Sequence, residues 1–465
     1  MTDFTFTTLK PGAHVHFIGI GGISMSALAE ILLQKNYIIS GSDIQKSPLT
    51  DKLAEKGASI FIGHVRENIK DADLIIYTAA VDDTNPEMQE ASALNIPTID
   101  RPKLLGAIMK KYPHAIAVAG THGKTTTTSM VSTILMHAKM DPTILVGELL
   151  DNIGGNVRIG DSTYFVTEAC EYCESFLKFY PHIGIVLNIE EDHLDYYRDL
   201  NHILEAFKKF ARLIPQEGSL IVCGDDANAM QIVNDATCNV VTYGTHKAHC
   251  DWRAQNIHWS KQGFANFDVA YRGNDLGNIT LRVPGVHNVY NSIAAIACAH
   301  VLGVDFPSIA QGISAYTGAR RRFEYKGNHK GFTVVSDYAH HPTEIKATLN
   351  AALKYPHNRI WCIFQPHTYT RTLSLIDTFK DSFDVADHII ITDIYAAREK
   401  DDGSIHAKDL VKKIKDKGIK ASYIAKFDDI ASYVKAHAQK DDLVLTMGAG
   451  SIDQLGEMII SEKSI

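Results

Sequence analysis

A glycine-rich turn in the first third of the chain carries residue types that bind phosphate groups. The turn Gly120–Thr125 reads Gly-Thr-His-Gly-Lys-Thr; it follows the apolar run Ala115–Ala119, a predicted buried strand, and precedes a predicted helix through Met136. In such a turn the backbone N–H groups and the helix dipole hold phosphate oxygens, Lys124 reaches the β- and γ-phosphates, and the Thr125 hydroxyl ligates Mg²⁺. The sequence therefore predicts an ATP or GTP site, in a shortened variant of the usual motif. The alternative is a chance Gly-Lys-Thr turn.

Two further glycine-rich turns follow predicted strands. Gly19–Ser24 begins at the end of the predicted strand His14–Ile20 and leads into the predicted helix Ile23–Gln34. Asp43 ends the next strand about twenty residues on, as in a dinucleotide-binding fold. Ser24 replaces the third glycine of that pattern, so the turn indicates a bound diphosphate without identifying NAD, and a turn without a ligand is the alternative. Gly448–Ser451 opens the last predicted helix and could approach a phosphate or only form a tight corner.

Acidic residues follow two predicted strands that should neighbour the phosphate-binding turn. Glu168 ends one strand, and the run Asp192–Asp195, which contains His193, comes shortly after the other. Phosphoryl transfer needs metal ligands at such strand ends, although solvated loop acids are the alternative. Cys170 and Cys173 form a single Cys-x-x-Cys, which is a weak zinc or redox signal and favours two loop cysteines without such a role.

Polar side chains with other uses gather later in the chain. Asn288 and Asn291 are three residues apart on a predicted helix and could read a base edge together, or Asn288 could cap the helix. Arg371 follows another predicted strand and is suited to grip a carboxylate with two parallel N–H bonds. One of His340 and His341 is expected to be structural.

The elements that must position these residues alternate along the chain. Apolar runs and amphipathic stretches follow one another, which predicts βαβ units around parallel sheets, while residues 254–283 predict antiparallel strands. The length of 465 residues predicts about three domains, and we expect the boundaries between them within residues 109–114 and 318–327. The net charge of −8 does not favour binding to nucleic acid or to an anionic membrane. No apolar run is long enough to span a bilayer, and no secretory signal is expected. Seven cysteines fit a reducing cytoplasm.

Eight motifs in order between Gly19 and Thr372 resemble those of the three-domain Mur ligases of peptidoglycan synthesis. They read Gly-x-Gly-Gly-Ile-Ser-Met-Ser, Gly-Thr-His-Gly-Lys-Thr-Thr, Glu-Ala-x-Glu, Asn-Ile-Glu-x-Asp-His-Leu-Asp, His-Asn-x-x-Asn, Arg-Arg-Phe-Glu, Asp-Tyr-Ala-His-His-Pro-Thr-Glu and Gln-Pro-His-Thr-Tyr-Thr-Arg-Thr. The resemblance implies an α/β fold with a Rossmann-like UDP-sugar-binding domain at 1–112 and a Rossmann-like amino-acid-binding domain at 321–465. Between them, at 113–320, it implies an ATP-binding domain with a mostly parallel sheet and an antiparallel segment.

The resemblance also implies an activity and its residues. The enzyme would use ATP and Mg²⁺ in the cytoplasm to join L-alanine to the lactyl carboxylate of UDP-N-acetylmuramate through an acyl phosphate, as a monomer or weak homodimer without nucleic acid or membrane insertion. Catalysis would rest on Lys124, Glu168 and His193, with Thr125, Glu168 and His193 on the metal. The substrate sites would comprise Gly120, Thr121, His122, Gly123, Lys124, Thr125, Thr126, Asn288, Asn291 and Arg321 for ATP; Gly19, Gly21, Gly22, Ser24, Asp43 and His64 for the UDP-sugar; and Tyr338, His340 and Arg371 for the amino acid.

Three other functions stay open at this point. They are a related recycling ligase that adds an intact tripeptide to the same sugar nucleotide, an NAD-dependent dehydrogenase, and a non-catalytic nucleotide-binding switch. Thr368 stands where many relatives have a second arginine, so carboxylate recognition would depend more on Arg371, and Cys170 and Cys173 replace acidic residues common in the family. Lys208 or Lys209 could be modified near a second metal ion, as a lysine is in some sister ligases.

Overall fold

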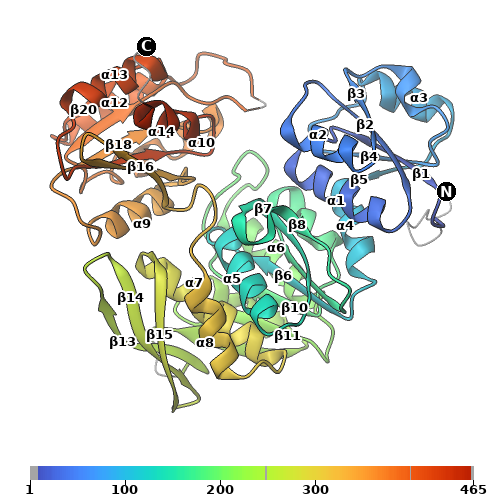
Figure 1. Cartoon of the computed structure of the whole chain (residues 1–465), viewed down its shortest axis with the longest axis horizontal. Coiled ribbons are helices and arrows are strands. Elements are labelled where there is room, and N and C mark those ends of the chain that lie inside the picture. Colours follow the sequence, from blue (N-terminus) through green and yellow to red (C-terminus); the bar gives the residue numbers. More distant parts are fainter. Residues whose placement is uncertain (1–8, 247–248, 398, 462–465) are drawn as a thin grey trace.

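Three separate β-sheets divide the chain into three α/β domains that follow one another in sequence. The computed structural model describes residues 9–246, 249–397 and 399–461. Figure 1 shows the first domain in blue, the central domain in green and yellow, and the third domain in orange and red. This architecture confirms the predicted three-domain α/β fold, while the boundaries at 112/113 and 320/321 stay predictions.

The first domain has a five-stranded, wholly parallel sheet in the order β3-β2-β1-β4-β5. Its central strand β1 is buried from Val15 to Ile18 and pairs with β2 and β4, as expected for a parallel sheet with helices on its faces. The elements are β1 (His14–Ile18), α1 (Ile23–Gln34), β2 (Ile38–Asp43), α2 (Pro48–Glu55), β3 (Ser59–Ile62), the 3₁₀ helix η2 (Arg66–Ile69), β4 (Leu74–Tyr77), α3 (Pro86–Ala93), β5 (Thr98–Asp100) and α4 (Arg101–Met109).

The central domain has a ten-stranded mixed sheet in the order β15-β14-β13-β12-β11-β10-β6-β9-β7-β8. Strands β13, β14 and β15 pair antiparallel, which confirms the expectation for residues 254–283. The elements are β6 (His114–Ala119), α5 (Lys124–His137), β7 (Thr143–Leu150), η3 (Asp151–Ile153), β8 (Gly155–Arg158), β9 (Tyr164–Glu168), η4 (Tyr172–Lys178), β10 (Ile183–Val186), α6 (Leu200–Arg212), β11 (Ser219–Cys223), η5 (Ala229–Asp235), β12 (Asn239–Gly244), β13 (Trp252–Trp259), β14 (Phe264–Tyr271), β15 (Asn274–Pro284), α7 (Val286–Val301) and α8 (Phe306–Ala315).

The third domain has a six-stranded sheet in the order β16-β17-β21-β18-β19-β20, in which β16 alone pairs antiparallel with its neighbour among the named strands. The elements are β16 (Glu324–His329), β17 (Phe332–Asp337), α9 (Pro342–Ala352), β18 (Ile360–Phe364), α10 (Tyr369–Ser374), α11 (Ile376–Phe379), β19 (His388–Ile391), α12 (Ala407–Asp416), β20 (Ala421–Tyr423), α13 (Phe427–His437), β21 (Leu443–Met447) and α14 (Asp453–Ile460).

The structure corrects three local predictions. Strand β1 ends at Ile18 and not at Ile20, because Gly19 adopts a left-handed φ of 82° and its N–H donates to the Ser42 carbonyl at 2.8 Å. Gly285 is the N-cap of α7, so Asn288 lies inside the helix and the capping alternative for it is wrong. The turn Gly448–Ser451 does not open the last helix directly, since α14 begins at Asp453.

Apolar packing joins the first two domains and leaves the third apart. One cluster of buried residues contains Phe17 and Leu104 of the first domain together with Phe176 and Phe207 of the central domain. The third domain has two clusters of its own, one on each face of its sheet. The third domain therefore meets the central domain mainly through polar residues, described below. In the described ranges, no helix combines the length and the apolar content that a bilayer crossing requires.

Candidate active site

The phosphate-binding turn lies between the central strand β6 and helix α5, as the sequence predicts. Gly123 adopts a left-handed φ of 84°, and a Cβ atom there would lie 2.6 Å from the Asn291 Oδ1 atom. A side chain at this position would therefore be strained and would push Asn291 away. The glycine lets helix α7 approach the turn, so that the phosphate loop and the predicted base-reading amides share one site.

Lys124 lies across this turn and holds it closed. Its Nζ atom donates to the carbonyl oxygens of Gly120 at 2.5 Å and Thr121 at 3.0 Å, and to the Glu171 carboxylate at 3.0 Å. Burial lowers the pKa of Lys124, but Glu171 and its acidic neighbours outweigh burial and raise the pKa above the ordinary lysine value. Lys124 is therefore a fixed cation whose ammonium group occupies the concave side of the turn.

Thr125 and Glu168 form the oxygen-rich part of the site. The Thr125 hydroxyl donates to Glu168 Oε2 at 3.0 Å, and the other Glu168 oxygen accepts from the Gly147 N–H at 2.6 Å. Hydroxyl and carboxylate oxygens are the ligands that Mg²⁺ prefers, so this pair fits the ion. His193, the third predicted ligand, packs on Tyr172 at 4.7 Å between ring centroids, and its role as a ligand stays a prediction.

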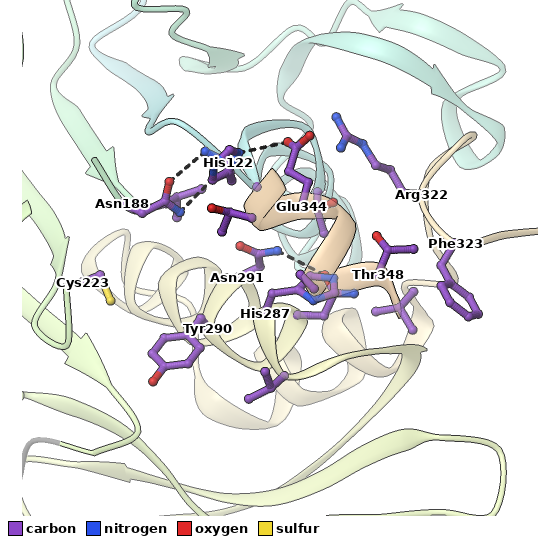
Figure 2. Close-up of a pocket in the computed structure, with 18 of the residues that line it drawn as sticks. His122, Asn188, Cys223, His287, Tyr290, Asn291, Arg322, Phe323, Glu344 and Thr348 are labelled. Atoms are coloured by element: carbon purple, nitrogen blue, oxygen red, sulfur yellow. Dashed lines mark hydrogen bonds and ion pairs between the residues drawn. The ribbon is translucent and has the colours of Figure 1, made fainter. Parts of the chain in front are cut away.

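A cavity of about 400 Å³ opens beside the phosphate-binding turn (Figure 2). Asn288 and Asn291 both line it, and the Asn291 amide donates to Asn288 Oδ1 at 3.1 Å, which confirms that they share one helical face. The walls come from the central domain, the linker and the start of α9, and they include His122, Asn188, Cys223, His287, Tyr290, Arg322, Phe323, Glu344 and Thr348. A heteroaromatic base fits such a space, because apolar walls surround a few amides.

The third domain completes this cavity through ion pairs. His122 Nδ1 lies 3.1 Å from Glu344 Oε1, and its Nε2 lies 3.4 Å from Glu190 Oε2. Burial lowers the pKa of His122, but hydrogen bonds to the two carboxylates outweigh it and raise the pKa to about 9. The imidazolium thus joins the phosphate-binding turn to helix α9 across the domain boundary.

The two neighbouring arginines of the linker face different surroundings. Arg322 lines the cavity, whereas Arg321 donates to the carbonyl oxygens of Gly448 at 2.7 Å and Gly450 at 3.0 Å in the third domain. Both guanidinium groups lie over the Tyr338 ring, at 4.6 and 4.9 Å from its centroid. The ATP contact expected of Arg321 stays a prediction, and of the two arginines it is Arg322 that lines the cavity.

Of the predicted amino-acid site, Arg371 lies at the second domain junction. Its Nη2 and Nε atoms donate to the same Asp192 oxygen at 2.9 and 3.1 Å, and a cavity of about 330 Å³ adjoins the pair. His193 and Thr368 also line this cavity. Tyr338 and His340 pack against each other at 5.3 Å between ring centroids but do not line it. The structure therefore places an arginine–carboxylate pair where a carboxylate ligand was predicted.

The predicted UDP-sugar residues gather at the carboxyl ends of β1, β2 and β3. Gly21 N–H donates to Asp43 Oδ2 at 2.8 Å, which ties the first glycine turn to the end of β2. His64 Nδ1 lies 2.9 Å from Ser42 Oγ and 3.1 Å from Glu87 Oε2. The Ser24 hydroxyl accepts from Arg101 at 3.0 Å. These contacts form one polar edge of the first sheet.

Sequence reasoning missed several residues of these sites. Asn188, Glu190 and Glu344 surround His122, and the Asn-Ile-Glu-x-Asp-His and His-Pro-Thr-Glu motifs that contain all three were the available signal. Glu87 belongs to none of the motifs, and only the structure shows its contact with His64. Cys170 and Cys173 are both free thiols.

The lysines considered for modification have carboxylate partners. Lys208 contacts Glu205 at 2.8 Å, and Lys209 contacts Glu174 at 2.9 Å.

Three family models match successive parts of the chain. They are described as the Mur ligase family catalytic domain at residues 14–113, the Mur ligase middle domain at 118–299 and the Mur ligase glutamate ligase domain at 321–450. Together they account for most of the sequence.

Full-length relatives carry the same organisation. A UDP-N-acetylmuramate–L-alanine ligase of Alkaliphilus metalliredigens is 56% identical over 450 residues, which is 97% of each chain. The protein of that name from Acetivibrio thermocellus is 54% identical over 452 residues, covering 97% of this chain and 96% of its own.

Solved structures agree in fold. The crystal structure of a UDP-N-acetylmuramate–alanine ligase from Thermotoga maritima superposes with a TM-score of 0.82 at 29% identity, over 96% of this chain and 98% of its own. A murein peptide ligase from Psychrobacter arcticus gives 0.73 at 26% identity, also over 96% and 98% of the two chains.

Proposed function

Because the chain belongs to the Mur ligase family, we propose that it joins L-alanine to the lactyl carboxylate of UDP-N-acetylmuramate with hydrolysis of ATP to ADP and phosphate. The observation that carries the proposal is 54–56% identity, over nearly the whole chain, to relatives named for this activity. Mur ligases are ATP-dependent, and the phosphate-binding turn beside a base-sized cavity supports the same nucleotide here.

The chemistry follows from the stability of a carboxylate. Because oxide is a poor leaving group, the lactyl carboxylate oxygen first attacks the γ-phosphorus, the bond to ADP breaks, and an acyl phosphate forms. The amine of alanine then attacks the acyl carbon, phosphate leaves, and the amine loses a proton. Lys124 is suited to the first step, since a fixed cation stabilises charge spread over the phosphoryl oxygens.

Thr125 and Glu168 would hold Mg²⁺, because both are oxygen donors and already lie in contact. The ion would supply charge neutralisation at the phosphates. We keep His193 as a proposed ligand on the motif alone.

The remaining ligands are assigned by position. We propose that Asn288 and Asn291 face the adenine, because they line the cavity together. Arg371 would bind the carboxylate of alanine, with Tyr338 and His340 nearby, and must exchange its Asp192 partner for the substrate. The polar edge of the first sheet, at Gly19, Gly21, Gly22, Ser24, Asp43 and His64, would bind the UDP-sugar.

We propose a cytoplasmic enzyme of small-molecule substrates, working as a monomer or weak homodimer. All seven cysteines are free thiols, which supports a reducing compartment. Sedimentation of the purified chain at assay concentration measures the oligomeric state.

Phosphate release tests the function. The full chain is incubated with ATP, Mg²⁺ and UDP-N-acetylmuramate, and with either L-alanine or L-Ala-γ-D-Glu-diaminopimelate. We expect release that depends on L-alanine. Release with the tripeptide alone would reassign the chain to the recycling reaction, a change in nicotinamide absorbance would indicate a dehydrogenase, and ATP binding without hydrolysis would indicate a switch.

A further inference from the structure

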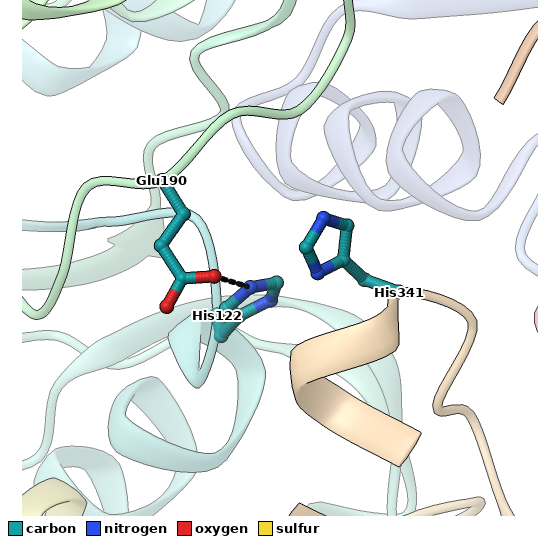
Figure 3. Close-up of side chains that lie close together, drawn as sticks. All are labelled: His122, Glu190 and His341. Atoms are coloured by element: carbon teal, nitrogen blue, oxygen red, sulfur yellow. Dashed lines mark hydrogen bonds and ion pairs between the residues drawn. The ribbon is translucent and has the colours of Figure 1, made fainter. Parts of the chain in front are cut away.

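Two histidines and one glutamate meet where the central and third domains join (Figure 3). His122 comes from the phosphate-binding turn, Glu190 from the loop after β10, and His341 from the N-cap position of α9. One ligand atom from each lies within 4.8 Å of the other two. We propose that this cluster, whose His122 and Glu190 also border the proposed nucleotide cavity, is a binding site for a divalent transition-metal ion such as Zn²⁺.

The donor set decides the class of ion. Two imidazoles and one carboxylate form a set used by zinc sites, and they leave a fourth position open for water. Mg²⁺ is disfavoured because it prefers oxygen ligands. Atoms this close to one another share a central point within about 3 Å, so shifts of about 1 Å reach the usual Zn–N distance of ~2.1 Å.

The surroundings already orient His122. Its Nδ1 atom lies 3.1 Å from Glu344 Oε1, so Nε2 is turned toward Glu190. A carboxylate on the far nitrogen is the arrangement that orients histidine ligands and raises their basicity. The ion would replace the Nε2 proton of the His122 imidazolium, which is released to solvent, while the Nδ1–H stays on Glu344. Glu344 therefore acts as the outer partner of the site.

His341 must give up one contact to bind the ion. One ring nitrogen lies 3.1 Å from the Glu191 carbonyl oxygen, and the other accepts from the Thr343 N–H at 3.3 Å. Both hydrogen bonds are near the long end of the usual range of donor–acceptor distances. A coordinate bond from His341 to the metal would therefore replace only a weak hydrogen bond. The His341 ring centroid is 4.8 Å from that of His122.

The ion has a route to the site and a structural effect there. His122 and Glu190 both line the large cavity, so an ion can enter through it. Because the ligands come from both sides of the junction, a bound ion holds the third domain on the central domain.

Titration of the full chain with Co²⁺ alone, without nucleotide, tests the site. We expect one equivalent of Co²⁺ to give the visible bands of a four-coordinate nitrogen and oxygen site, without sulfur charge-transfer absorption and unaffected by excess Mg²⁺. Zn²⁺ should displace the Co²⁺ and raise the midpoint of thermal unfolding. Binding that produces sulfur charge transfer would place the ion on cysteines and overturn the proposal.

Matched variants locate the ion. His341→Asn keeps a residue that can cap the helix, and Glu190→Gln keeps the size of the side chain. Each substitution should weaken Co²⁺ binding at least ~10-fold, because loss of even an outer partner of a metal ligand lowers metal affinity 10–100-fold. The controls are His406→Asn, which alters the N-cap histidine of α12, and Glu191→Gln at the exposed neighbouring glutamate. Circular dichroism verifies folding. Equal affinity in all four variants and the wild type would overturn the proposal.

Discussion

Glu87→Gln should destabilise the first domain through a buried hydrogen-bond network. The Glu87 carboxylate is fully buried and accepts from Ser42 Oγ at 2.6 Å and Asn68 Nδ2 at 2.6 Å, while His64 Nδ1 lies at 3.1 Å. An amide has one acceptor oxygen where the carboxylate has two, so at least one donor loses its partner. A hydrogen bond to a charged group contributes about 1.5–3 kcal/mol, and we expect a loss of that size in the free energy of opening the domain.

Amide hydrogen exchange in β1 and β2 measures this loss. Because 1.4 kcal/mol is tenfold in an equilibrium constant, exchange at pH 7 should become about 10- to 150-fold faster. Glu90→Gln on the same helix, at a partly exposed position, is the control and should exchange at the wild-type rate.

The same network predicts a pH dependence. Burial raises the pKa of Glu87, but the nearby His16 ring and hydrogen bonds from Ser42 and Asn68 outweigh burial and lower the pKa below the ordinary value of 4.5. The ionised network therefore contributes stability above pH 4.5 that is lost as the pH falls through the lowered pKa. The wild type should converge on the variant in acid. Indistinguishable exchange of Glu87→Gln and Glu90→Gln at pH 7 would refute the reasoning.

Other substitutions separate the proposed roles. Lys124→Ala should lower kcat at least ~100-fold without unfolding the protein, because loss of a single electrostatic group at an active site has an effect of this size. Near-normal phosphate release by this variant would show that Lys124 does not act at the phosphate site. Arg371→Ala should raise the KM for alanine ~10-fold or more while the KM for ATP changes little, because a charged hydrogen bond contributes ~1.5–3 kcal/mol; the reverse pattern would move the amino-acid site. Arg322→Ala should raise the KM for ATP more than Arg321→Ala does, and fluorescence titration with an ATP analogue can compare the affinities of the two variants. The opposite ranking would favour Arg321 as the residue that contacts ATP.

The phosphate-binding turn could be predicted because its determinants are local. The strand, the glycines, Lys124 and Thr125 are contiguous, and their arrangement follows from the strand–turn–helix connection. The antiparallel segment at residues 254–283 was equally visible, since polar and apolar residues alternate with the period of a strand.

The contacts across domain junctions could not be predicted. His122 and Glu344 are 222 residues apart, and Arg371 and Asp192 are 179 apart, so no periodicity or spacing connects them. The different surroundings of Arg321 and Arg322 could not be predicted for another reason. Arg321 has a left-handed φ of 57°, a backbone conformation that is uncommon for arginine and that the sequence does not indicate. This conformation turns the side chains of Arg321 and Arg322 toward different partners.

The unequal packing of the domains has a consequence for turnover. The first two domains share an apolar cluster, whereas the third contacts the central domain through ion pairs that water can replace. The linker bends between Ala319, which packs on the central domain, and Phe323, which packs on the third, with left-handed backbone at Arg321 and Phe323. Swinging of the third domain is therefore a candidate for the slow step of each cycle, and the rate would then respond to the viscosity of the solvent as well as to the reactivity of the bonds.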